Sequence, residues 1–138
     1  MRLGEIVIDS DNIEELSGFY AQLLGWTKSS QIHEGEKWII VAKEDYSEAP
    51  IIFQENPDYR RPKWPVDRSD KEAQQQMIHL DFYVTMTEFS GAVGHAIECG
   101  AQICATQFTD SWTVLIDPSG HPFCIIPIPD EVYQQRYN

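Results

Sequence analysis

His79 and Asp81 stand two positions apart in the strand-like run 79–84. Alternate residues of a strand project from the same face, so we expect both side chains on one side of a sheet. A histidine there can act as a metal ligand or a general base, with Asp81 lining the same cleft. The other interpretation is a histidine that is only hydrogen-bonded at a strand end, and the residues leave both open.

The three cysteines, Cys99, Cys104 and Cys124, are odd in number and show no CxxC spacing. This pattern argues against a disulfide framework and against a cysteine zinc knuckle. Cys124 stands in an apolar run, where a free cysteine is typically packed in the core. As a thiolate ligand, it would instead draw the preference of a site toward Zn²⁺.

Other catalytic signatures are missing from the sequence. The chain has no GxSxG motif, no glycine-rich phosphate loop and no HExxH motif. We therefore find no support for a hydrolase triad, a nucleotide-dependent enzyme or a metalloprotease.

Two similar sets of elements surround the candidate residues. A strand-like run and an amphipathic helix ended by glycine begin each half, and about three strands follow. The first set comprises strands at 5–9, 38–42 and 51–54, a weaker one near 26–28, and a helix at 13–24. The second comprises strands at 79–84, 101–105, 112–116 and 123–126, and a helix at 89–97. Capping boxes are predicted at Asp11 with Glu14 and at Thr85 with Glu88.

A constant offset relates the two sets. Glu5 and His79 are 74 positions apart, as are Trp38 and Trp112. This agreement indicates an internal duplication. We expect an α+β fold of two βαβββ modules that form a curled mixed sheet around a central cleft. Glu5 and His79 then stand at equivalent positions of the two modules.

The 138 residues suit one domain, because neither half would bury much core alone. We expect module one at 1–56, a crossover at 57–76, module two at 77–130 and a short C-terminal tail at 131–138. Three prolines exclude regular structure from the start of the crossover. Whether the modules pair within one chain or between the two chains of a homodimer is left open.

The formal net charge of −12 argues against nucleic-acid and membrane-surface partners. It favours a cationic small-molecule ligand, or serves solubility alone. No stretch approaches the roughly 20 apolar residues of a membrane helix. The first residues lack the apolar block of a signal peptide. We expect a reduced, cytoplasmic protein.

Four segments carry a family resemblance: 18–26, 59–65, 79–81 and 117–124. In this order, and with the duplicated layout, the chain resembles the vicinal oxygen chelate superfamily, most closely its glyoxalase-like domain subgroup. That superfamily includes glyoxalase I, extradiol dioxygenases and bleomycin- and fosfomycin-resistance proteins. The resemblance covers nearly the whole chain.

The resemblance implies one metal ligand from the first strand and one from the last strand of each module. The matching positions are Glu5, then Gln54 or Ile52, then His79 and Cys124. The implied cofactor is one divalent ion, Zn²⁺, Ni²⁺, Mn²⁺ or Fe²⁺, or none. Cys124 departs from the His, Glu and Gln ligands that are usual in the family.

Further residues are candidates for the substrate cleft. Besides Ile52 and Asp81, these are Trp38, Trp112, Arg60 and Trp64. Aromatic residues in strands also form plain core, Trp64 can pack on the flank of a sheet, and the arginines can pair with surface carboxylates. These alternatives stay open.

Three functions follow from the resemblance. The first is a metal-assisted lyase, isomerase or dioxygenase that acts on a small molecule with adjacent oxygens, with Glu5 as a metal-linked base. The second is a metal-free binding protein of the bleomycin-resistance type. The third is a metal-free acid–base enzyme that uses Glu5 and His79.

Overall fold

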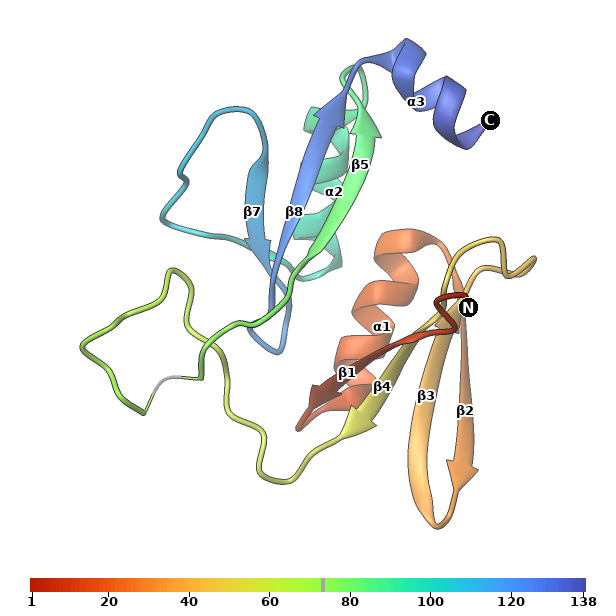
Figure 1. Cartoon of the computed structure of the whole chain (residues 1–138), viewed down its shortest axis with the longest axis vertical. Coiled ribbons are helices and arrows are strands. Elements are labelled where there is room, and N and C mark those ends of the chain that lie inside the picture. The colour runs from red at the N-terminus through yellow and green to blue at the C-terminus, as the bar shows by residue number, and fades with distance from the viewer. Residues whose placement is uncertain (73) are drawn as a thin grey trace. The chain divides into compact units, whose positions relative to one another are not determined.

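The computed structural model describes residues 1–72 and 74–138 (Figure 1). The chain divides into two compact units, residues 1–59 and residues 60–138. None of the helices in the described residues is both long enough and apolar enough to cross a bilayer.

The first unit is one helix on a four-stranded mixed sheet. Its elements are β1 (Ile6–Ser10), α1 (Ile13–Leu24), β2 (Thr27–His33), β3 (Glu36–Ala42) and β4 (Ile51–Glu55). The strand order is β1-β4-β3-β2. β1 runs parallel to β4, and the other two pairs are antiparallel.

The helical face of this sheet forms the core of the unit. Ile39, Val41 and Phe53 are fully buried. Tyr20 of α1 stacks on Phe53 of β4, with ring centroids 5.6 Å apart. Because strand side chains alternate, Glu5 and Ile52 have the opposite parity and project from the other face.

Helix α1 has the predicted bounds, but its N-cap is one residue later than the predicted capping box. The N-cap is Asn12, whose Oδ1 accepts a hydrogen bond from the Glu15 backbone N–H at 3.2 Å. The prediction of Asp11 with Glu14 is therefore wrong. Glu14 instead pairs with Lys28 and Lys37. These two ammonium groups, which donate hydrogen bonds to Glu14, lower the pKa of its carboxyl to about 2.

The second unit repeats the layout and adds a helix. Its elements are β5 (Leu80–Thr85), α2 (Phe89–Cys99), β6 (Gln102–Ile103), β7 (Thr113–Ile116), β8 (Pro122–Ile128) and α3 (Asp130–Tyr137). The strand order is β5-β8-β7-β6. The predicted hydrogen bonds between Thr85 and Glu88 are present: the Thr85 Oγ1 accepts from the Glu88 N–H and donates to its carboxylate. Thr85 is nevertheless not the N-cap, because α2 begins at Phe89 and its N-cap is Glu88. Helix α3 occupies most of the segment 131–138, which was predicted as a short C-terminal tail.

The predicted α+β fold of two βαβββ modules is confirmed. In both units the first strand pairs in parallel with the last, and the last pairs antiparallel with the third. The hydrogen bonds make two open four-stranded sheets, where we expected one curled sheet. Within each sheet the two edge strands, β1 and β2 or β5 and β6, do not pair with each other, so each sheet is open. The central cleft and the single-domain organisation stay predictions.

The crossover is attached to the turn that precedes β8. Arg61 Nη1 donates to the Pro118 carbonyl at 2.8 Å. Its aliphatic stem lies over Gly120, which has a φ of +93°. The buried carboxylate of Asp117 organises the same turn, since it accepts hydrogen bonds from the backbone of Ser119 and from the backbone and ring of His121.

Candidate metal centre

Three side chains of different chemistry converge in the second unit. His79 directly precedes β5, Asp81 lies within it, and Cys124 lies on β8. Asp81 and Cys124 are Cα partners in the parallel pair of β5 and β8. One potential ligand atom from each of the three residues lies within 4.8 Å of the others. Strand alternation and register together produce this cluster, which we call the His79–Asp81–Cys124 cluster.

Both nitrogens of His79 have polar partners. Nε2 lies 3.2 Å from Asp81 Oδ1, and Nδ1 lies 3.0 Å from Gln76 Nε2. The Gln76 amide carries both a donor and an acceptor, so it can partner either tautomer of the ring. Sequence reasoning missed Gln76, which stands in an irregular segment with no periodic signal.

The sulfur of Cys124 lies on the buried side of the cluster. Cys124 is 7% exposed and packs with Cys104 and Val114, against which Trp64 also packs. The pKa of the Cys124 thiol is raised to about 11. Burial is the largest cause, and the negative charge and hydrogen bond of Asp81 add to it. In the absence of a metal, the thiol is therefore protonated at neutral pH.

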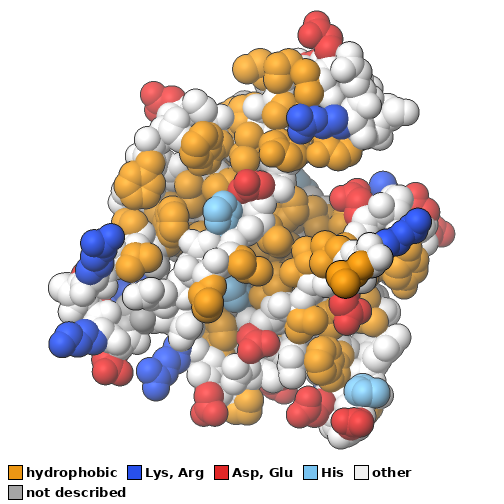
Figure 2. Space-filling model, viewed as in Figure 1, with side chains coloured by type: hydrophobic (Ala, Val, Ile, Leu, Met, Phe, Trp, Pro, Cys, Tyr) orange, Lys and Arg blue, Asp and Glu red, His pale blue; other side chains and the backbone are white. Residues whose placement is uncertain are grey.

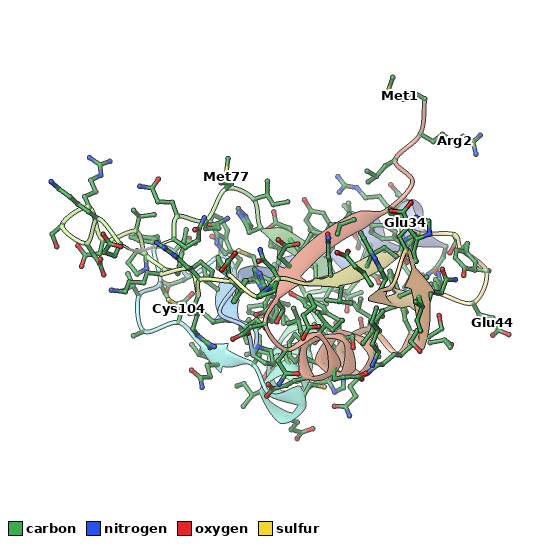
Figure 3. All side chains as sticks on the ribbon, turned by 90° about the horizontal axis from the view of Figure 1, so that it is seen from below. Met1, Arg2, Glu34, Glu44, Met77 and Cys104 are labelled. Atoms are coloured by element: carbon green, nitrogen blue, oxygen red, sulfur yellow. The ribbon has the colours of Figure 1, made fainter. Side chains whose placement is uncertain are left out.

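The donor set fits a divalent ion. Zinc binds imidazole nitrogen at about 2.0–2.1 Å and cysteine sulfur at about 2.3 Å, so small side-chain rotations would bring the three donors onto one ion. The His79 and Asp81 side chains are 43% and 40% exposed, which leaves one side of the cluster open to solvent. Met77, two residues before His79, projects outward from the same segment (Figure 3). Three protein ligands with an open side are typical of catalytic rather than structural zinc sites.

The duplicated register identifies the corresponding positions in the first unit. Ile6 pairs with Ile51, as Leu80 pairs with Phe123. Glu5 therefore corresponds to His79, Val7 to Asp81, and Ile52 to Cys124. An isoleucine offers no ligand atom. Gln54 is two residues farther along β4, opposite Asp9 and Trp38. The roles of Glu5 and Gln54 at a metal stay predictions.

Among the predicted cleft residues of the second unit, Trp64 packs against Cys104, Val114 and Cys124. Trp112 directly precedes β7 and is 39% exposed. Trp38 is half-buried on β3. Arg60 is exposed and lies 3.7 Å from Glu72, a loose ion pair. Their contribution to substrate binding stays a prediction.

A second histidine–cysteine pair lies on α2. His95 Nε2 is 3.6 Å from the Cys99 sulfur, one helical turn away. Partial burial and the neighbouring Glu98 charge raise the pKa of the Cys99 thiol. The described residues contain no third His, Cys, Asp or Glu grouped with this pair, so it offers at most two ligands.

On the face drawn in Figure 2, the acidic side chains do not gather at one place. Figure 2 shows acidic side chains at several separate positions on the visible face, with hydrophobic side chains between them.

Comparison with solved structures shows the fold. A fosfomycin resistance protein, FosX, from Mesorhizobium loti has a TM-score of 0.66 and 9% identity, with 98% of each chain covered. A glyoxalase/bleomycin resistance protein/dioxygenase family enzyme from Burkholderia phytofirmans has a TM-score of 0.65 and 20% identity, covering 93% of this chain and 99% of the other.

A third structure contains ligands. It is a mutant FosX from Listeria monocytogenes complexed with Mn(II) and 1S,2S-dihydroxypropylphosphonic acid. Its TM-score is 0.67 at 11% identity, with 96% of this chain and 97% of the other covered.

The sequence itself identifies the family. No curated protein matches the chain. The family model described as a glyoxalase-like domain matches residues 5–126, from the start of β1 to most of β8. The chain therefore belongs to the glyoxalase-like domain family of the vicinal oxygen chelate superfamily.

Proposed function

We propose that this protein is a divalent-metal-dependent enzyme that acts on a small, oxygen-rich molecule as a lyase, isomerase or oxygenase. The observation that carries the proposal is the His79–Asp81–Cys124 cluster, with its three different donors within 4.8 Å. Its open side leaves room for a substrate or water at a further coordination position. A bound ion would supply Lewis acidity toward a substrate oxygen.

The chain's own residues have separate tasks in this proposal. His79, held by Gln76 on its other nitrogen, and Asp81 are the accessible ligands. Glu5, which stands before β1 as His79 stands before β5, is the proposed base or a further ligand, and Gln54 is a weaker further ligand. Arg60, which forms a loose ion pair with Glu72, is proposed to hold an anionic substrate group.

The ligands of the Listeria FosX support a small oxygen-rich substrate. That protein is complexed with Mn(II) and a dihydroxypropylphosphonic acid. We therefore propose vicinal diols, phosphonates and catechols as the first compounds to test for turnover.

Metal analysis tests the proposal. The full-length protein, purified without chelator and supplied with Zn²⁺, Ni²⁺, Mn²⁺ or Fe²⁺, is expected to retain about one ion per chain, and His79→Ala is expected to lose it. A wild-type protein that stays metal-free with every ion supplied would exclude a metal-dependent enzyme.

The role of Glu5 can be separated from that of the ligands. Glu5→Gln is expected to keep the metal and lose turnover if Glu5 is the base. If Glu5 is a ligand, the same variant loses metal as well. Full turnover with a normal metal content in Glu5→Gln would remove Glu5 from the proposal.

One observation favours a second function, that of a metal-free binding protein. Cys124 packs with Cys104 and Val114, and its thiol is protonated at neutral pH. With a net charge of −12, such a protein would take cationic ligands. This function predicts that cationic drugs, glycopeptides among them, raise the melting temperature equally in chelator and in His79→Ala. Stabilisation by none of them would exclude it.

A further inference from the structure

Cys124 has two possible roles, a packed thiol or a metal ligand, and the direction of its side chain distinguishes them. It lies opposite Asp81 in the parallel ladder, so both side chains project from the same face of the sheet. The thiol is hydrogen-bonded to the Asp81 carboxylate. A cysteine that only fills a core has no need of such a partner, and here the sulfur faces the two other potential ligands.

The packing behind Cys124 fixes the sulfur in this direction. Val114 pairs with Cys124 on one side and accepts a hydrogen bond from the Cys104 backbone on the other, so the three residues form one row across β8 and β7. All three are less than 8% exposed. This buried row, with Trp64 packed against it, excludes water from one side of the sulfur. The side that faces His79 and Asp81 stays accessible to a metal ion.

Only one thiol is available to this cluster. Cys104 lies in the same row, but two strand spacings, roughly 10 Å, separate it from Cys124. That separation also exceeds what a disulfide can bridge. Cys99 lies on α2, beside His95. The donor set is therefore one sulfur, one nitrogen and one carboxylate oxygen.

We propose, on the basis of the function proposed above, that Cys124 binds the metal as a thiolate together with His79 and Asp81, and that the site takes Zn²⁺ or Co²⁺ rather than Mn²⁺. On binding, the sulfur–metal bond forms as the S–H proton leaves to solvent. Thiolate is a soft ligand that suits zinc, whereas Mn²⁺ prefers oxygen donors. The Listeria FosX, by contrast, is complexed with Mn(II).

Cobalt spectroscopy of the metal-free, full-length protein tests the ligand directly. Anaerobic titration with Co²⁺ is expected to give a thiolate-to-cobalt charge-transfer band in the near ultraviolet that saturates at one ion per chain. Zn²⁺ should abolish the band at one equivalent, whereas Mn²⁺ in large excess should not. Because most sites prefer Zn²⁺ to Mn²⁺ to some degree, the band itself is the decisive result.

Three cysteine variants provide the controls. Cys124→Ser is expected to lose the band. Cys104→Ser removes a buried thiol from the same row, and Cys99→Ser removes the thiol beside His95, so both should keep it. A band that survives in Cys124→Ser, or that disappears in Cys99→Ser, would overturn the assignment of Cys124.

A second measurement covers the case in which Cys124→Ser does not fold. X-ray absorption of the zinc-loaded wild-type protein should show one sulfur scatterer at about 2.3 Å. One bound ion, lost in His79→Ala, with no sulfur scatterer and no charge-transfer band would overturn the thiolate ligand and leave the proposed function intact. No binding of Co²⁺, Zn²⁺ or Mn²⁺ would overturn both.

Discussion

Asp81 connects the two other members of the cluster. Its carboxylate lies 3.2 Å from His79 Nε2 and is hydrogen-bonded to the Cys124 thiol. Without a metal, this negative charge and the burial of the sulfur both raise the pKa of the thiol, so the thiol stays protonated. The same residue that holds the thiol neutral is thus the one that would share an ion with it.

Asp81→Asn is expected to lower the pKa of the Cys124 thiol below its present value of about 11, because a like charge is removed. The pKa should stay above its ordinary value, since burial is the largest cause of the shift. Alkylation of the metal-free protein, followed by mass spectrometry across a pH series, measures this. The thiolate, and with it the alkylation rate, should appear at lower pH in the variant.

Cys99 provides an internal reference for that experiment, because its raised pKa depends on partial burial and on Glu98. Its alkylation profile should be the same in the wild-type and Asp81→Asn proteins. An unchanged Cys124 profile, or one displaced to higher pH, would contradict the role given to Asp81.

Gln76 is a positioning residue for His79. Gln76→Ala is expected to weaken metal binding by roughly 10–100-fold, the usual effect of removing the hydrogen-bond partner of a histidine ligand. Gln76→Glu should restore binding, since a carboxylate also accepts from Nδ1–H. Titration with Zn²⁺ against a competing chelator measures the affinity. The exposed neighbour Gln75 is the control, and equal losses in Gln75→Ala and Gln76→Ala would contradict the prediction.

Single residues were predictable to the extent that strand alternation fixes their face. His79 and Asp81 were expected on one face, and their side chains are in contact. Cys124 joins them through the register of β5 and β8, a pairing between segments about 40 residues apart that no local pattern contains. Gln76 lies outside any strand or helix, so no periodicity could indicate it.

At the scale of the element, the start of α1 shows how a local signal can be ambiguous. Asp11 with Glu14 and Asn12 with Glu15 both have the spacing of a capping box. Asn12 is the N-cap, with its backbone N–H donating to Ser10 Oγ at 2.9 Å. Glu14 is paired with Lys28 and Lys37 from the neighbouring hairpin, which the sequence could not foresee.

Asn12→Ala is expected to lower the free energy of unfolding by about 1 kcal/mol, because the Glu15 N–H loses its partner. Asp11→Ala is the matched control and should have little effect. Urea denaturation followed by circular dichroism measures both. A larger loss in Asp11→Ala than in Asn12→Ala would place the cap at the earlier residue.

Gly120→Ala is expected to destabilise the protein by about 1 kcal/mol or more, because its φ of +93° is strained for any other residue. A Cβ there would also lie 2.5 Å from Arg61 Cγ. In an Arg61→Ala background the steric part of the loss should disappear, while the backbone part remains. Thermal unfolding of the four proteins measures the coupling. If Gly120→Ala lowered the stability by the same amount in the wild-type and Arg61→Ala backgrounds, the contact between Arg61 and the turn would be contradicted.

The helices and most strands agree with their sequence patterns, but α3 was missed. This helix, Asp130–Tyr137, has no buried residue and hence no apolar face to reveal it. Its order comes from contacts between aromatic and charged groups. Tyr133 and Tyr137 have ring centroids 5.0 Å apart, and Arg136 lies over the Tyr83 ring at 5.8 Å.

At the scale of the whole molecule, the duplication was the strongest signal in the sequence. Two equal strand orders follow from it, and the family match over residues 5–126 agrees with it. The two units have nonetheless diverged in chemistry. His79, Asp81 and Cys124 occupy the positions at which the first unit has Glu5, Val7 and Ile52. Although the two units have the same fold, the second has all three potential ligands at these positions and the first has only Glu5 there.

Anomalous diffraction at the zinc edge, from crystals of the zinc-loaded protein, tests directly whether His79, Asp81 and Cys124 hold one divalent ion. We expect one strong peak per chain, about 2.0–2.3 Å from His79 Nε2, an Asp81 oxygen and Cys124 Sγ. A crystal with no peak at this cluster, or with zinc only at His95 and Cys99, would contradict it.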